Sequence, residues 1–315
     1  MLKSRVCDML GIEYPVFQGA MAWIADAKLA AAVSEAGGLG IIAAMNSNGE
    51  QLREQIRKAK ELTDKPFGVN LMLMSPYINE AVDVVCEEKV RIVTTGAGSP
   101  GKYMEQLISN DISVFPVVAS VTIAKMVERM GAAGVIAEGC ESGGHVGETT
   151  TMALVPQVVD AVKIPVLAAG GIADSRGMAA ALMLGAEGIQ MGTRFLTAAE
   201  CSVHDNYKAA VLKAKDRDTI VTGKSLGHPV RSLKNDMSRE FSKLEADSTT
   251  DATVLEKMGS GALKRAAIDG DVKNGSCMCG QIAGLVNSID SCAEIVHGIC
   301  EGCEEIFGGV SRWVK

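Results

Sequence analysis

A histidine set among glycines is the feature of this sequence best suited to chemistry. The segment from Ala137 to Gly147 reads AEGCESGGHVG, so that His145 follows an apolar run ending at Glu138. Two later apolar runs also end in glycine, at Gly170-Gly171 and at Gly192-Thr193. If the three runs are neighbouring parallel strands, backbone N–H groups surround a phosphate there, with one titratable ring beside it. We therefore expect an active site with His145 as its proton donor or acceptor.

Other polar and apolar positions are expected at the same strand ends, which together form the mouth of the site. Met21 and Ala22 follow the first apolar run and Asn70 lies within the third, so that a flat heterocycle could rest against them. Met21 is equally explained as core, and Asn70 as a bridge between loops. Glu138 has three open roles: orienting His145, holding a ligand hydroxyl, or capping the glycine loop. His228, in a Gly-His-Pro turn, is the other histidine that could reach the mouth.

The elements that must position these residues follow a strand–helix rhythm. Amphipathic helices are expected at Asn48–Leu62, Ile78–Glu88 and Ile123–Met130. Eight apolar runs predict strands: 15–18, 38–44, 67–71, 91–95, 113–118, 134–138, 165–169 and 188–191. An open doubly wound sheet is the competing architecture, but it usually carries a Gly-x-Gly-x-x-Gly turn after its first strand, which is missing here. We predict an α/β fold, a (β/α)8 TIM barrel.

The rhythm breaks after the eighth run. Residues 198–275 are richer in charge and predict a smaller inserted lid domain, which leaves 1–197 and 276–315 for the barrel domain. Apolar positions with helical spacing resume at Ile282, Leu285, Val286, Ile289, Ile295, Val296 and Ile299. We assign them to the last barrel helix, with the insertion between strand 8 and that helix.

Composition narrows the class of protein. The chain has 315 residues, 47% of them hydrophobic and 4% aromatic, which suits short buried strands beneath helices. A formal net charge of -7 without a basic stripe argues against nucleic acid as the partner. No stretch is apolar enough for a membrane span or a signal peptide, so we expect a cytoplasmic protein.

The nine cysteines do not form a clear motif. Their odd number speaks against a disulfide framework. Cys277 and Cys279, like Cys300 and Cys303, are spaced as in some zinc or iron–sulfur sites. Reduced thiols acting as small apolar side chains are the explanation we favour over a metal. Cys292 and Cys303 are expected on a helix.

Several segments resemble the FMN-dependent enoyl-acyl-carrier-protein reductase II family. They are YPVFQGAMAW at 14–23, KPFGVN at 65–70, VTTGAG at 93–98, GGH at 143–145, GTRF at 192–195, GHPVRSLKN at 227–235 and GQIAGL at 280–285. Nitronate monooxygenases share the barrel, the FMN and the Gly-Gly-His motif, but the last two segments favour the reductase branch. Cys140 and Cys279 depart from what we expect in relatives.

The resemblance implies an oxidoreductase of fatty-acid elongation. FMN is reduced by NADH or NADPH and then delivers hydride to the trans-2 double bond of an enoyl thioester carried by acyl carrier protein. The residues implied around FMN are Met21, Ala22, Asn70, Gly170, Gly171, Gln190, Gly192 and Thr193, with His145 catalytic. A homodimer and, in some relatives, a monovalent cation are also implied. For the acidic carrier, Arg231, Lys234 and Arg239 are candidate docking residues, unless they are ordinary surface charge.

Two other functions remain open at this point. A nitronate monooxygenase would use the same FMN and histidine with oxygen in place of a nicotinamide cofactor. A non-catalytic flavin- or phosphate-binding protein would use His145 only for packing.

Overall fold

Eight parallel strands form the centre of the computed structural model, which describes residues 2, 4–45 and 47–313. The strands are β1 (Val16–Gln18), β2 (Gly40–Ala43), β3 (Phe67–Met72), β4 (Ile92–Gly96), β5 (Ser113–Val118), β6 (Val135–Glu138), β8 (Val166–Ala169) and β9 (Gly188–Met191). Their order in the sheet is β1-β9-β8-β6-β5-β4-β3-β2. A parallel bridge between Phe17 and Leu39 joins the two ends of this order. The sheet therefore closes into the predicted TIM barrel.

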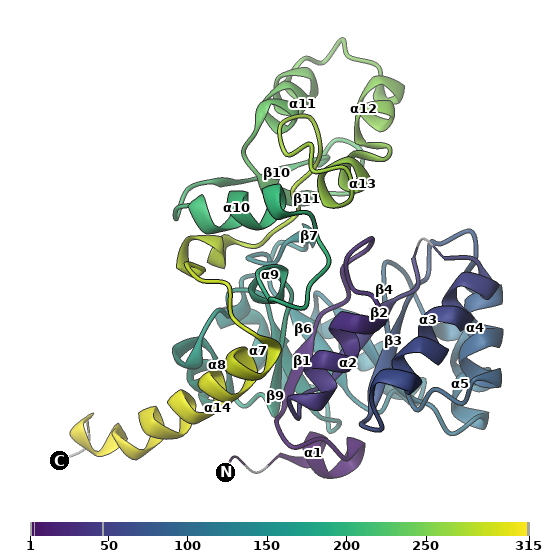
Figure 1. Cartoon of the computed structure of the whole chain (residues 1–315), viewed down its shortest axis with the longest axis vertical. Coiled ribbons are helices and arrows are strands. Elements are labelled where there is room, and N and C mark those ends of the chain that lie inside the picture. The colour runs from purple at the N-terminus through teal and green to yellow at the C-terminus, as the bar shows by residue number, and fades with distance from the viewer. Residues whose placement is uncertain (1, 3, 46, 314–315) are drawn as a thin grey trace.

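Helices surround the barrel, as Figure 1 shows. They are α2 (Ala27–Glu35), α3 (Gly49–Leu62), α4 (Ile78–Glu87), α5 (Gly101–Ser109), α6 (Val121–Arg129), α7 (Thr151–Val159), α8 (Ser175–Met183) and α14 (Cys292–Gly308). A short helix, α1 (Arg5–Leu10), lies below the barrel. The start of α3 shows why the sequence pattern was informative: Asn48 and Gln51 form a capping box that satisfies backbone N–H groups of the first turn.

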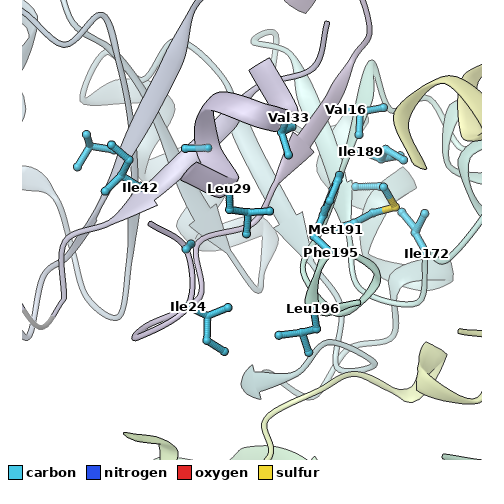
Figure 2. Close-up of a cluster of buried hydrophobic side chains, with 14 of the residues drawn as sticks. Val16, Ile24, Leu29, Val33, Ile42, Ile172, Ile189, Met191, Phe195 and Leu196 are labelled. Carbon is cyan, nitrogen blue, oxygen red and sulfur yellow. The ribbon is translucent and has the colours of Figure 1, made fainter. Parts of the chain in front are cut away.

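Two layers of apolar side chains hold the barrel together. Side chains alternate between the faces of a strand, so one set points inward and the next outward. The inward set packs with α1 and includes Phe17, Ile41, Phe115, Ile136 and Leu167. The outward set packs under the helices. Figure 2 shows part of it, with Val16 and Ile189 from the strands and Leu29 and Val33 from α2.

The insertion follows the eighth strand. After the one-turn α9 (Thr193–Leu196), the insertion contains α10 (Asp205–Lys213), β10 (Thr219–Thr222), β11 (Val230–Leu233), α11 (Asp236–Ala246), α12 (Ala252–Gly259) and α13 (Ala262–Ala267). In Figure 1, α11, α12 and α13 stand above the barrel end at which β9 finishes. The outgoing and returning chains meet at an isolated bridge between Ala198 and Asp290. The inserted element between the eighth strand and the last barrel helix is as expected, whereas the limits 198 and 275 stay a prediction.

The last barrel helix begins later than its apolar spacing predicted. Residues Gln281–Leu285 form a separate 3₁₀ helix, and α14 begins at Cys292. Ser291 caps α14, because its hydroxyl accepts from the backbone of Glu294 and the Glu294 side chain binds back to Ser291. Ile282 and Ile289 thus lie outside the helix to which we assigned them. Within the described residues, no helix is long and apolar enough to cross a bilayer.

Candidate active site

The carboxyl ends of the strands open into a cavity of about 600 Å³ between the barrel and the insertion. A volume of this size is typical of small-molecule and cofactor sites. The nine residues predicted for the site all line it: Met21, Ala22, Asn70, His145, Gly170, Gly171, Gln190, Gly192 and Thr193. The barrel thus brings together positions that are spread over most of the sequence.

Strand alternation explains which side chains form the floor of the cavity. Asn70, Glu138 and Gln190 point to the inside of the barrel. Glu138 lies two positions after the inward-facing Ile136, and Gln190 pairs with the inward-facing Ala169. Asn70 lies two positions after Gly68, which pairs with the inward-facing Ile92. The three polar side chains form the polar layer above the apolar filling. The Asn70 amide donates to the hydroxyl of Thr94 at 2.9 Å, so it links two neighbouring strands while lining the cavity.

Glycines form one wall of the cavity. Gly170 and Gly171, directly after β8, have φ of 87° and 71°, left-handed values that favour glycine. At Gly192, after β9, an added β-carbon would meet only the Met21 side chain, 3.8 Å away, so free space borders this backbone. The hydroxyl of Thr193 already accepts from the N–H of Gly280 at 2.8 Å. Left-handed glycines after β8 and the loosely covered backbone of Gly192 after β9 fit the phosphate cradle expected from the sequence.

His145 does not lie at a barrel strand end, as we expected, but on a strand of a second sheet. Gly144–His145 form β7, which pairs antiparallel with β11 of the insertion. The order of this sheet is β10-β11-β7. Sequence reasoning missed this strand because two residues between glycines carry no strand pattern. His145 therefore lines the cavity from a short β ladder that joins the loop after β6 to the insertion.

A second imidazole stands beside His145. The ring centroids of His145 and His228 are 6.4 Å apart in an edge-on arrangement. Surrounding protein shields part of the His145 ring from water and lowers its pKa, although the residue stays exposed on one side. Repulsion between the two rings when charged lowers the pKa of His145 further. The His145 ring is accordingly mostly neutral at pH 7, with one N–H to donate.

Two carboxylates lie below His145. Glu138 lines the cavity at the end of β6, where loss of hydration raises its pKa to about 7, while the Ser142 side chain lowers it. Glu141 is occupied by Thr151, since it accepts from the Thr151 N–H at 2.9 Å and from the Thr151 hydroxyl at 2.9 Å. Of the roles left open for Glu138, capping the glycine loop falls instead to Glu141 and Thr151.

Arg231 connects the insertion to the segment between β6 and α7 that carries His145, which we call the histidine loop. Only 8% of Arg231 is exposed. Its guanidinium donates from Nε and Nη2 to the backbone carbonyl of Cys140, at 3.2 and 2.9 Å, and from Nη1 to the Thr219 hydroxyl at 3.1 Å. A buried side chain with these partners is not available to a docking protein, so our expectation for Arg231 was wrong. Lys234 and Arg239 are exposed.

The insertion and the returning chain close the cavity from above. Ser260, Gly261, Leu263 and Lys264 line it from around the start of α13. The Lys264 ammonium lies 5.1 Å from the centre of the Trp23 ring, on the loop after β1. Met278, on the returning chain, also lines the cavity, and its carbonyl accepts from the buried Tyr207 hydroxyl at 2.8 Å. Of these residues, only Trp23 lies in a segment that the sequence analysis singled out, and the others had no signal in the sequence.

The cysteines lie apart from this chemistry. All nine are free, and Cys201, Cys277, Cys279, Cys292, Cys300 and Cys303 are buried. Burial raises the pKa of Cys277 to about 12, so this thiol stays protonated and apolar. Across the described part of the chain, no three His, Cys, Asp or Glu side chains are grouped closely enough to hold a metal ion.

Comparison with known proteins agrees with this geometry. The family model of nitronate monooxygenase matches residues 3–83 and 74–302. The chain belongs to the nitronate monooxygenase family. Its members are FMN-dependent oxidoreductases, and so is this protein.

Individual relatives carry several names. The structure of FabK from Thermotoga maritima superposes with a TM-score of 0.97 at 49% identity, covering 100% of both chains. A probable nitronate monooxygenase of Staphylococcus saprophyticus is 34% identical and covers 97% of this chain and 99% of its own. A (3aS,4S,5R,7aS)-5-hydroxy-7a-methyl-1-oxo-octahydro-1H-indene-4-carboxyl-CoA dehydrogenase of Rhodococcus jostii is 33% identical, with 95% of each chain covered.

Proposed function

We propose that the protein is an FMN-dependent enoyl-acyl-carrier-protein reductase, which uses NADH or NADPH to reduce the trans-2 double bond of enoyl thioesters. The observation that carries this proposal is the likeness to FabK of Thermotoga maritima over the whole chain, at 49% identity. We take FabK as a representative of the enoyl-acyl-carrier-protein reductase II family that the sequence resembles. The curated relatives with other names are 32–34% identical.

The residues of the cavity fit FMN. We assign the phosphate to the backbone at Gly170, Gly171, Gly192 and Thr193, because Gly170 and Gly171 are left-handed and only the Met21 side chain approaches Gly192. We assign the ring system to Met21, Ala22, Asn70 and Gln190, a mixed apolar and amide surface. When bound, FMN supplies the transfer of hydride from the nicotinamide to the alkene.

The chain itself positions the substrate and manages a proton. A neutral His145 ring can donate an N–H to the thioester carbonyl, which polarises the double bond, and we assign the proton for the α-carbon to the same ring. The insertion, through Leu263, and the returning chain, through Met278, cover the cavity and exclude water. Lys234 and Arg239 are exposed and are our candidates for contact with an acidic carrier, although Lys234 also donates to the Arg217 carbonyl and Arg239 pairs with Asp236.

A nitronate monooxygenase is the second candidate, favoured by the family model and by the Staphylococcus relative. It would place the same His145 as a base toward a nitroalkane-derived substrate and would need oxygen instead of a nicotinamide.

Anaerobic stopped-flow spectroscopy of the flavin separates the two. We expect NADH or NADPH to bleach the flavin, and a short trans-2-enoyl thioester to restore its colour without oxygen. A flavin that NADH and NADPH both leave oxidised, but that turns over with a nitronate in air, would refute the reductase proposal and support the monooxygenase.

A further inference from the structure

Lys264 lines the cavity and carries a positive charge. Of the described residues that line it, Lys264 is the only lysine or arginine. The other ionisable residues of the wall near the floor are Glu138 and Glu141, and His145 is mostly neutral. Apart from the backbone of the glycine cradle, Lys264 is therefore the main attraction for an anionic group that enters the cavity.

The Lys264 side chain has no acidic partner. Its ammonium forms no ion pair or hydrogen bond with another described residue, and it lies 5.1 Å from the centre of the Trp23 ring, in a cation–π contact. A cation–π contact at an exposed site is worth only about 0.5–1 kcal/mol. The contact therefore orients the ammonium only weakly, and its N–H groups keep their hydrogen-bonding capacity for a ligand.

The backbone of Trp23 is strained, which points to a function for this contact. Trp23 has φ of 67°, in the left-handed region that bulky residues avoid. The turn around it is held because the N–H groups of Ile24 and Ala25 both donate to the Met21 carbonyl, at 3.0 and 2.8 Å. The large apolar side chain of Trp23 is 38% exposed at the rim. Strain of this kind costs on the order of 1–3 kcal/mol and tends to occur at ligand sites.

Helix α13 fixes Lys264 on the opposite side of the rim. The Arg265 guanidinium donates to the Ser260 carbonyl at 3.1 Å and thereby closes the preceding turn. The N–H of Ser276 donates to the carbonyl of Ala262 at 2.8 Å and ties the helix to the returning chain. Lys264 is thus placed by a braced segment rather than by a free loop.

We propose that Lys264, held against Trp23 at the rim, is a binding site for the phosphate group of a substrate that enters above the flavin. The ligand chemistry is a phosphate ester or diphosphate, which both a nicotinamide dinucleotide and a phosphopantetheine thioester carry. The inference rests on the proposed function for the identity of these substrates, but the phosphate site itself does not require it. The FMN phosphate has its own place in the glycine cradle.

Binding without turnover gives the first test. Trp23 and Trp313 are the two tryptophans of the chain, so Trp313→Phe leaves Trp23 as the only reporter. Inorganic pyrophosphate is titrated into FMN-loaded protein in this background while Trp23 emission is followed. We expect Lys264→Ala to weaken pyrophosphate binding about 10- to 100-fold, the usual loss for a hydrogen bond to a charged group. Lys257→Ala is the matched control, because Lys257 is exposed on α12 and does not line the cavity.

Steady-state kinetics then distinguish the two sources of phosphate. One arm compares the KM of NADH in the Lys264→Ala and Lys257→Ala proteins. The other compares a trans-2-butenoyl thioester of phosphopantetheine with that of N-acetylcysteamine, which lacks phosphate. If Lys264→Ala raises the KM of NADH about tenfold or more, Lys264 holds the nicotinamide dinucleotide. If it raises the KM of the phosphopantetheine thioester but not that of the N-acetylcysteamine thioester, Lys264 holds the acyl substrate.

Three results would overturn the inference. They are pyrophosphate binding that is equal in the Lys264→Ala and Lys257→Ala proteins, unchanged KM values in both arms, and an equally large loss of FMN affinity, which would assign Lys264 to the flavin. A protein that takes up no FMN, or shows no enoyl-dependent oxidation of NADH or NADPH, contradicts the proposed function instead. The pyrophosphate titration of flavin-free protein still decides the phosphate site in that case.

Discussion

Replacing Arg231 with methionine separates the anchoring of the histidine loop from the stability of the fold. Arg231 donates twice to the Cys140 carbonyl and once to Thr219, and it is buried without a carboxylate partner among the described residues. Its backbone lies opposite Gly144, next to His145, in the ladder between β11 and β7. Arg231→Met therefore removes the side-chain tether of that loop while methionine fills most of the space.

The stability change should be small because two effects oppose each other. Leaving the Cys140 carbonyl without a donor costs about 1–3 kcal/mol. Removing a buried, unpaired guanidinium regains several kcal/mol of desolvation free energy. We therefore expect the free energy of unfolding to change by no more than about 2 kcal/mol.

The catalytic change should be larger and confined to one step. If the loop relaxes, His145 shifts relative to the substrate, and a displacement of about 1 Å can cost about 100-fold. Reduction of the flavin by NADH needs no proton from His145, whereas its reoxidation by an enoyl thioester does. We expect the reoxidation rate to fall about 10- to 100-fold while the reduction rate stays within about twofold of the parent value.

Anaerobic stopped-flow measures both steps on FMN-loaded protein. Arg217→Met is the control, since Arg217 is exposed and removes the same charge from the insertion. Arg231→Lys should recover part of the rate, because one ammonium can still reach the Cys140 carbonyl. If Arg231→Met reoxidises as fast as the parent, or if both steps slow equally, the tether does not position His145.

Three further predictions follow from the site. His145→Ala should keep the yellow FMN bound and slow enoyl reduction by about 100-fold or more, the usual size of an acid–base contribution; undiminished turnover would exclude that role. His228→Gln should raise the pKa of His145 by removing the repulsion between the rings, which moves the His145 limb of the kcat/KM profile to higher pH; a limb that stays in place contradicts the pairing. Glu138→Gln tests the carboxyl group whose pKa burial raises to about 7. The stability that the protonated carboxyl contributes is fully present below its ordinary pKa of 4.5 and is lost as the pH rises through 7. In urea unfolding of flavin-free protein, the free energy of unfolding of Glu138→Gln should therefore rise relative to that of the parent between pH 5 and pH 8, by on the order of 1–2 kcal/mol after solvent screening. A difference in stability that does not depend on pH would argue against this pKa.

Local patterns were enough to predict the barrel and the floor of its site. Each strand and its following helix is a short segment whose apolar spacing and capping residues act over a few positions, as at Asn48 and α3. Parallel strands of a barrel end at one face, so glycines at 170, 171 and 192 had to come together once the fold was known. The helix beginning at Cys292 was placed less well, because a run of apolar residues does not itself mark a first turn.

Only the tertiary structure decided how the top of the site is built. His145 pairs with β11, and Arg231 reaches the carbonyl of Cys140, 91 positions away in the sequence. Lys264 likewise meets Trp23 from the far end of the chain. Such contacts join single residues of two distant segments, and they depend on how the insertion folds back over the barrel. The sequence by itself therefore determined the barrel, the glycine cradle and the chemical identity of the histidine. The partners and the electrostatic surroundings of that histidine arise from long-range packing, which has no periodic trace in the chain.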